Sequence, residues 1–429
     1  MKIAVSGISS LIDSNIFLRA FWSELRNRFG KCAWHYQPFK DGSSRTIFLG
    51  WANINKERTV SISLSYSQKS IVNGIHFGEQ FDETIDESSE LGRQLKDAVK
   101  TAFDHRHKPS IETFQLPISS LYSSLSPYSG QWFEILPNQH PISLLSIKVR
   151  AFDYEDAKTE ILRVVSPILD VLSVETNNLF WLYKTEDNQV NISKAELGEM
   201  LYPEVNNFVT DEKWMDEIPI NNGYLLLSSQ AIQFIDRILS KDELSSAEDA
   251  FISSCHHYHI ARSQDALIYN RLFSCGKQEN EDGSVEFHLQ EDSRLKTASM
   301  FSRRAEEIAT VLYMSAIEVA STIDSNPPKK CSNCGQEQYK ISARVVDYVT
   351  KYLGLKEGHH LSKVFKSHYE KRSKYLHAGV MLTDNSYTGT TIPRLDPSSD
   401  SGVSQRTSVL LANLREWIGY MLRQQLKTM

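Results

Sequence analysis

The chain has 429 residues, of which 41% are hydrophobic and 23% charged, and its formal net charge at pH 7 is −6. These values exclude an intrinsically disordered chain and a uniformly basic coat protein for nucleic acid. The length exceeds the usual size of one domain, so we expect two or three domains.

Two further features of the composition predict the environment of the protein. No window contains 18 consecutive apolar residues, so we expect no membrane span, and the first residues indicate a strand and not a signal peptide. The five cysteines are odd in number and sparse, which argues against a disulfide framework. A cytoplasmic protein is therefore expected.

The charge is unevenly distributed along the chain. Residues 294–380 contain fifteen Lys and Arg against eight Asp and Glu, a net charge of +7, which leaves −13 for the rest of the chain. A basic segment in an acidic protein suits local contact with phosphates. The alternative is that these lysines are only the solvated faces of helices.

The first half of the chain mixes helical and strand patterns. Helical spacing predicts helices over residues 10–29 and 89–105, and β-branched or alternating sequence predicts strands over 45–52 and 59–67. Residues 112–142 contain many Ser, Pro and Gly and predict a long connection with one or two strands. This half is therefore expected to be an α+β region.

A clearer strand and helix follow this connection. Residues 143–152 predict a strand, and residues 153–172 predict a helix that Asp153 caps, with acidic residues in its first turn. A further strand is expected over 179–184. Residues 185–224 carry few periodic signals.

From about residue 225 onward the chain becomes helical. Apolar residues at helical spacing predict helices over 231–239, 242–273, 295–325, 342–353, 360–377 and 405–426. Gly354 and Gly379 are expected to end the fourth and fifth of these helices. We therefore predict an α+β sensor or regulatory region over residues 1–240, with a possible break near 140, and an all-α helical bundle over 241–429.

The helix at 360–377 ends in the sequence Tyr-Glu-Lys-Arg-Ser-Lys-Tyr-Leu-His-Ala-Gly, which places Arg372 five residues before His377. Histidine titrates near neutral pH, so it can take a proton from a ribose 2′-hydroxyl or give one to a leaving oxygen. The guanidinium of arginine matches a phosphate and the charge that grows on it. This pair would let RNA cleave itself through attack by the 2′-oxygen, without a metal ion.

This motif resembles the signature of the HEPN superfamily, and its local form is similar to the ApeA-like branch. Glu318, on the preceding long helix, resembles the acidic position that this branch carries opposite the motif. The resemblance covers residues 241–429. It implies a metal-independent HEPN ribonuclease with Arg372 and His377 as catalytic residues, supported by Ser373, Glu318 and Tyr369.

The resemblance also implies partners and a biological role. These are an RNA substrate, a homodimer or higher homo-oligomer, and anti-phage defence by abortive infection, in which a phage-derived trigger would act on the first half of the chain. Helix geometry bears on the homodimer, because five residues turn the chain by about 500°, which leaves Arg372 and His377 about 140° apart on one helix. HEPN nucleases resolve this by dimerising, so the resemblance implies that two copies of the motif line one cleft.

Two other interpretations of the motif stay open. Arg372 could simply pair with Glu370 or Glu318, and a histidine near the end of a helix is common for capping reasons. The helical region would then be a non-catalytic module that binds RNA or a nucleotide, or one that only forms dimers.

Two cysteine-containing segments are candidate metal sites. Cys331 and Cys334 have the spacing of half a zinc knuckle, so a structural zinc ion is possible, with His359 and His360 or a second copy supplying further ligands. No cofactor is expected for catalysis. The run from Cys255 to His259 favours packing over metal binding, because adjacent residues of a helix point apart.

Overall fold

The computed structural model describes most of the chain, in segments separated by gaps. The described residues are 1–30, 33–40, 45–54, 58–79, 85–120, 124–138, 142–182, 220–221, 224–240, 243–272, 274–279, 285–290, 295–324, 329–330, 337–338, 341–379, 394–395, 403–404 and 411–429.

The chain forms two compact units. The first consists of Met1–Phe114 and Ile147–Arg163, and the second of Gln115–Ser146 and Val164–Met429. The boundary near residue 240 that the sequence suggests stays a prediction.

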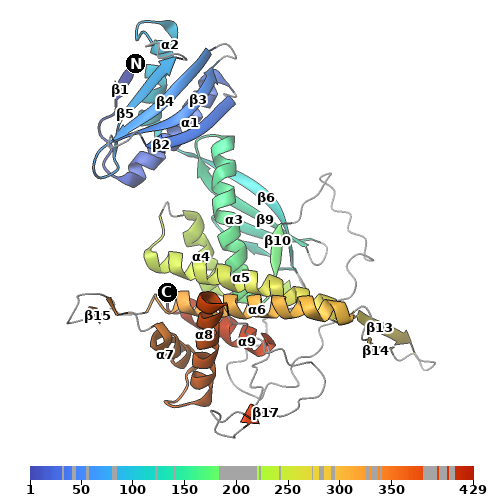
Figure 1. Ribbon diagram of the computed structural model, residues 1–429. Helices are drawn as coiled ribbons and strands as arrows, with labels where there is room; N and C mark the ends of the chain where they lie inside the picture. The colour runs from blue at the N-terminus through green and yellow to red at the C-terminus, as the bar shows by residue number, and fades with distance from the viewer. Residues whose placement is uncertain are drawn as a thin grey trace. The chain divides into compact units, whose positions relative to one another are not determined.

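The first unit contains a five-stranded antiparallel sheet and two helices (Figure 1). In spatial order the strands are β1 (Lys2–Ala4), β5 (Val72–Glu79), β4 (Arg58–Tyr66), β3 (Thr46–Ile54) and β2 (Ala33–Lys40). The helices are α1 (Leu11–Phe29) and α2 (Glu90–His105). The predicted helices at 10–29 and 89–105 and the predicted strands at 45–52 and 59–67 are thus confirmed, whereas β2 and β5 were not predicted.

The core of this unit lies between the sheet and its helices. Alternate residues of β4 are buried, as one face of a half-covered sheet requires. They pack with apolar residues of α1 and α2 in one cluster, which includes Phe17, Phe21, Leu25, Val60, Ile62, Leu64, Leu95 and Val99. The hydroxyl of Ser10 accepts the backbone N–H of Asp13 at 3.0 Å and so caps α1.

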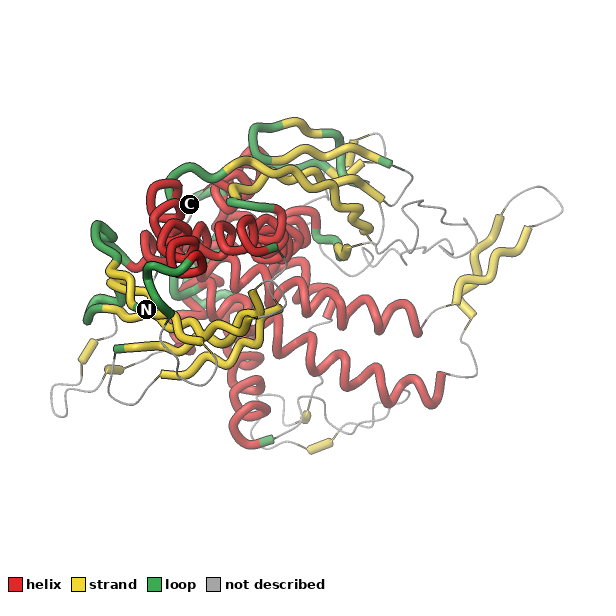
Figure 2. Tube along the Cα trace, turned by 90° about the horizontal axis from the view of Figure 1, so that it is seen from above, coloured by secondary structure: helices red, strands yellow, loops and turns green. Residues whose placement is uncertain are grey.

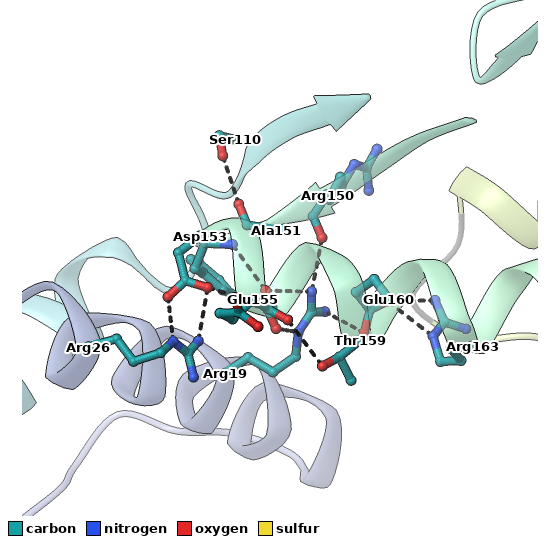
Figure 3. Close-up of polar contacts among 12 residues, drawn as sticks. Arg19, Arg26, Ser110, Arg150, Ala151, Asp153, Glu155, Thr159, Glu160 and Arg163 are labelled. Carbon is teal, nitrogen blue, oxygen red and sulfur yellow. Dashed lines mark hydrogen bonds and ion pairs between the residues drawn. The ribbon is translucent and has the colours of Figure 1, made fainter. Parts of the chain in front are cut away.

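Arginine–carboxylate pairs join α1 to the start of α3 (Tyr154–Thr176) within the first unit (Figure 3). Arg26 donates to both oxygens of Asp153 at 2.7 and 2.9 Å, and Arg19 donates to both oxygens of Asp156 at 2.9 and 3.0 Å. Asp153 also accepts the backbone N–H of Asp156 at 2.8 Å, which confirms it as the cap of α3. Burial alone would raise the pKa of Asp153, but Arg26 and this N–H hold that pKa below its ordinary value.

A second five-stranded sheet contains the strand that precedes α3. In spatial order its strands are β10 (Phe180–Leu182), β6 (Ser110–Ser120), β9 (Ile142–Ala151), β8 (Phe133–Pro137) and β7 (Tyr128–Ser129). The predicted strands at 143–152 and 179–184 are confirmed. The stretch 112–142 holds more strand than its composition predicted, because β6, β7 and β8 all fall largely within it.

The rest of the second unit is mainly helical. Its helices are α4 (Ser229–Ser240), α5 (Ser246–Leu272), α6 (Leu295–Ala320), α7 (Ile341–Leu353), α8 (His360–Ala378) and α9 (Leu411–Leu426). The long helices α5 and α6 lie side by side in both views (Figures 1 and 2). The hairpin of β13 (Ser274–Glu279) and β14 (Val285–Gln290) connects them. Short paired strands occur at 220–225, 329–338 and 394–404.

A buried carboxylate joins three of these helices. Asp265 of α5 is 0% exposed, and its Oδ2 accepts from Arg262 at 3.2 Å, from the hydroxyl of Tyr313 in α6 at 3.1 Å and from Arg415 in α9 at 3.3 Å. Burial of a charge is costly unless the charge is paired, so this carboxylate and its two arginines require one another.

The same network holds the C-terminal end of α3. Arg423 donates to the carbonyl of Val174 at 2.9 Å, and Arg262 donates to the carbonyl of Asn177 at 3.3 Å. Tyr258 donates to the side chain of Asn177 at 2.6 Å. The last carbonyls of a helix have no N–H donors within the helix, and the N–H groups of these two arginines take that place.

The architecture is therefore a β-rich N-terminal region with two antiparallel sheets, followed by a C-terminal region of helices. At this level the predicted order of an α+β region before a mainly helical region is confirmed, although the helical region also contains the hairpin of β13 and β14. Among the described helices, none combines the length and the apolar character that crossing a membrane requires.

We expect Asp265→Ala to lower the free energy of unfolding by about 3–5 kcal/mol, because it leaves Arg262 and Arg415 buried without their shared carboxylate. Urea unfolding followed by circular dichroism measures the change. Asp347→Ala, an exposed change on α7, is the control and should cost less than about 0.5 kcal/mol. Equal losses in the two variants would contradict a special role for Asp265.

Candidate active site

Helix α8 carries the Arg372–His377 motif, and both of its ends are capped. The ring Nδ1 of His359 accepts the N–H of Leu361 at 3.3 Å at the start of the helix. Gly379 has a φ of 64° and donates its N–H to the carbonyl of Tyr375 at 3.1 Å. This left-handed cap is the one that the sequence predicted, and only glycine adopts it without steric cost.

One face of α8 packs against the rest of the second unit. Leu361, Phe365 and Tyr369, spaced four residues apart, are buried, and the ring of Phe365 lies 5.8 Å from that of Trp417 in α9. Arg372 follows Phe365 by two turns, so it projects from the same face of α8.

Arg372 is held from α6 by two polar side chains. Its Nη1 lies 2.5 Å from Oε2 of Glu318, as an ion pair without hydrogen-bond alignment, and its Nη2 donates to the hydroxyl of Ser315 at 3.2 Å. The side chains of Arg372 and Glu318 are 15% and 21% exposed. The position of Glu318 opposite the motif, which the resemblance implied, is therefore observed, and so is the structural pairing that was the alternative interpretation.

Tyr369 completes this group. The guanidinium of Arg372 lies 5.8 Å from the centre of its ring, within reach of a cation–π contact. Burial and the charge of Glu318 raise the pKa of the Tyr369 hydroxyl, while Arg372 opposes the shift. Tyr369 is consequently a neutral donor near pH 7 and contributes no charge to the group.

His377 lies on the other side of the helix. It is exposed, whereas Ser373, one turn earlier, is half-buried. The part of the chain that the structure describes gives His377 no hydrogen-bond or ion-pair partner. The imidazole is thus open to a ligand, and the structure does not bring it together with Arg372 within one chain.

His368 is a residue that the sequence interpretation missed. It precedes Arg372 by four residues, so the two share a face of α8. Its Nε2 is buried without a hydrogen-bond partner among the described residues. Burial of the ring and the charge of Lys371 lower the pKa of His368 to about 4, so this histidine is neutral near pH 7. The spacing alone could have identified it as the histidine on the arginine's face.

Cys331 and Cys334 lie outside the described residues, so the zinc hypothesis stays a prediction. Within the residues that are described, no group of three or more His, Cys, Asp and Glu is arranged to hold a metal ion.

The cluster from Cys255 to His259 packs as the sequence indicated. Cys255 is fully buried, and burial raises the pKa of its thiol. His256 and His259 lie on one side of α5, and their Nδ1 atoms are 3.0 and 2.7 Å from the two oxygens of buried Asp170. The Nε2 of His259 accepts the N–H of Phe180 at 3.3 Å, so this ring is engaged on both sides.

Comparison with known proteins gives no relative: no family model, no curated protein and no solved structure matches the chain.

The Arg372–Glu318 pair can be measured with a double-mutant cycle. We expect a coupling energy of about 1 kcal/mol between Arg372→Met and Glu318→Gln in the free energy of unfolding, because the pair is largely shielded from solvent. The control cycle combines Glu318→Gln with Lys374→Met, an exposed change on the same helix, and should show no coupling. Equal coupling in both cycles would mean that Glu318 does not hold Arg372.

The buried ring of His368 makes stability depend on pH. In the unfolded chain this histidine binds a proton near pH 6.5, but in the folded protein only near pH 4, so acid favours the unfolded state between these values. We expect wild type to lose stability as the pH falls from 6.5 to about 4, and His368→Gln to lose less over that range. Urea unfolding at several pH values tests this, and identical pH profiles would refute it.

Proposed function

We propose that the protein is a metal-independent endoribonuclease of the HEPN type, with Arg372 and His377 as its catalytic residues. The observation that carries the proposal is the arrangement on α8. Arg372 is fixed by Glu318 and Ser315 of α6, and His377 five residues later is exposed and free to meet a ligand. An oriented guanidinium and an open imidazole are the groups that cleavage by a ribose 2′-oxygen requires.

The proposed reaction breaks one bond and forms one. The 2′-oxygen attacks the phosphorus and loses its proton to an imidazole, while the bond from phosphorus to the 5′-oxygen breaks and that oxygen receives a proton. The products are a 2′,3′-cyclic phosphate and a 5′-hydroxyl. Arg372 would stabilise the negative charge that develops on the non-bridging oxygens.

We further propose that the active form is a homodimer. Arg372 and His377 project about 140° apart from α8, so one copy does not direct both at the same phosphate. Two copies of the motif lining one cleft would supply a base, an acid and two guanidinium groups. The exposure of Leu376, which is 48% exposed beside His377, supports an apolar contact surface at this end of α8.

The biological role that the resemblance implies is also part of the proposal. An RNA-cleaving enzyme harms its own cell unless it is restrained, so the N-terminal region would detect a phage-derived trigger and release the nuclease. Expression of wild type at rising dose should then slow growth, whereas His377→Ala should not.

A second candidate function is binding of RNA without cleavage. The observation that favours it is the Arg372–Glu318 ion pair. Glu318 balances the charge of Arg372 within one chain, so this arginine would stabilise the charge of a transition state less. Arg372→Ala would then weaken RNA binding or folding, and neither wild type nor the variant would cut RNA.

Cleavage of RNA by the purified full-length protein in EDTA decides between these functions. We expect wild type to produce 2′,3′-cyclic phosphate ends and His377→Ala to lose at least about 100-fold in rate, the usual contribution of a general acid or base. His360→Ala, a change at the other end of α8, is the control and should cleave normally. Cleavage that His377→Ala retains in full would refute the assignment of His377.

A further inference from the structure

The solvent face of α8 carries a line of charged residues that ends at His377. Residues 363, 366, 370, 374 and 377 are spaced by three or four positions, so they lie along one side of the helix. They are Lys363, Lys366, Glu370, Lys374 and His377, and all five are exposed. This side faces away from the buried row of Leu361, Phe365 and Tyr369.

The positive charge on this face is not neutralised. Within the described residues, Lys363, Lys366 and Lys374, here called the lysine stripe, form no ion pair, and Glu370 is the single acid between them. Two exposed lysines elsewhere show the contrast, because Lys158 pairs with Glu155 and Lys351 with Asp324. The whole of α8 contains five Lys and Arg against one Glu. An uncompensated row of this kind attracts a polyanion.

We infer that the lysine stripe binds the phosphodiester backbone of single-stranded RNA and leads it to His377. His377 lies fourteen positions after Lys363, or about 21 Å along the helix axis, which is long enough for several successive phosphates. This inference rests on the proposed nuclease function, since His377 lies at the end of the row.

The chemistry of the face favours RNA over an anionic membrane. Helices that lie on membranes combine lysines with an apolar side that enters the lipid. The exposed positions of the row are polar throughout, and Phe365 on the apolar side of α8 packs against Trp417, which leaves Leu376 as the one large apolar side chain of this helix that is strongly exposed. Ammonium groups alone suffice to hold phosphates.

A phosphate that reaches His377 at the C-terminal end of α8 needs a cation nearby. The C-terminal end of α8 carries a partial negative charge, which disfavours a phosphate near His377. Lys374 lies in the last full turn, and the N–H of Gly379 donates to the carbonyls of Lys374 and Tyr375. Both features reduce the negative potential where the scissile phosphate would lie.

Binding through phosphates alone is independent of base sequence. The lysine stripe would therefore provide affinity and direction, and any preference for particular bases would have to arise elsewhere.

The test measures RNA affinity at several salt concentrations. The probe is a fluorescent oligouridylate, and the proteins carry His377→Ala in the full-length chain so that the RNA stays intact. We expect Lys363→Gln, Lys366→Gln and Lys374→Gln together to reduce the slope of log affinity against log salt by about 2, because each phosphate contact on a single strand contributes about 0.7. Affinity at about 0.1 M salt should fall tenfold or more.

The control removes three exposed lysines of the first unit, Lys69, Lys100 and Lys108, also as glutamine, and should leave the slope unchanged. Circular dichroism of both triple variants checks folding. Equal slopes for the two triple variants would refute the inference. Loss of binding to phosphatidylserine vesicles in the stripe variant, with RNA binding intact, would also refute it and assign the surface to a membrane.

The inference and the nuclease proposal can fail separately. If wild type binds RNA with the expected slope but cleaves none, the nuclease proposal fails and the binding surface stands. If the stripe variant, with His377 present, cleaves RNA with unchanged kcat/KM, the binding surface fails and the nuclease stands.

Discussion

The helical region depends on one buried carboxylate oxygen, Oδ2 of Asp265, which accepts from α5, α6 and α9 at once. This contact fixes the rotation of α6, because Tyr313 must face Asp265. Around the axis of α6, Ser315 lies about 200° from Tyr313 and Glu318 about 140° from it, after one full turn. Both therefore project from the side of α6 opposite to Tyr313. That side is where Arg372 of α8 is held. The buried network and the candidate site are therefore two faces of the same helix.

Helix α8 separates two kinds of electrostatic environment. On its inner face the charge of Arg372 is balanced by Glu318, and His368 is kept neutral by burial. On its outer face the lysines are exposed and unbalanced among the described residues. Charges that are paired inside stabilise the fold, whereas charges left unpaired at the surface remain available to a partner. A role for Arg372 in catalysis would require a substrate phosphate to share it with Glu318.

The sequence predicted those elements whose signals are local. Helices α1, α2, α3, α7 and α8 have apolar residues at helical spacing, and some of them also have caps at their ends, namely Ser10 for α1, Asp153 for α3 and Gly379 for α8. Each helix was located within a few residues. Strands β2 and β5 were missed although each pairs with the neighbouring strand of the chain, because β2 contains Pro38 and β5 contains Gly74 and Gly78, and proline and glycine are depleted in strands. The described part of helix α9 begins at Leu411, and residues 405–410, which were also predicted to be helical, lie outside the described residues.

Only part of the candidate site was predictable from the sequence, namely the part that depends on the geometry of a single helix. Glu318 was found through the resemblance, and the 100° turn per residue was enough to show that Arg372 and His377 diverge. The pairing of Arg372 and the burial of His368 depend on α6 and on the packing around α8, which no local pattern encodes. The same geometry places His377 on the face of the lysine stripe and Arg372 on the face of the core. In the proposed enzyme, a second copy of α8 would therefore have to present its own Arg372 or His377 to the phosphate that the first copy binds, so the proposals of catalysis and of a homodimer stand or fall together.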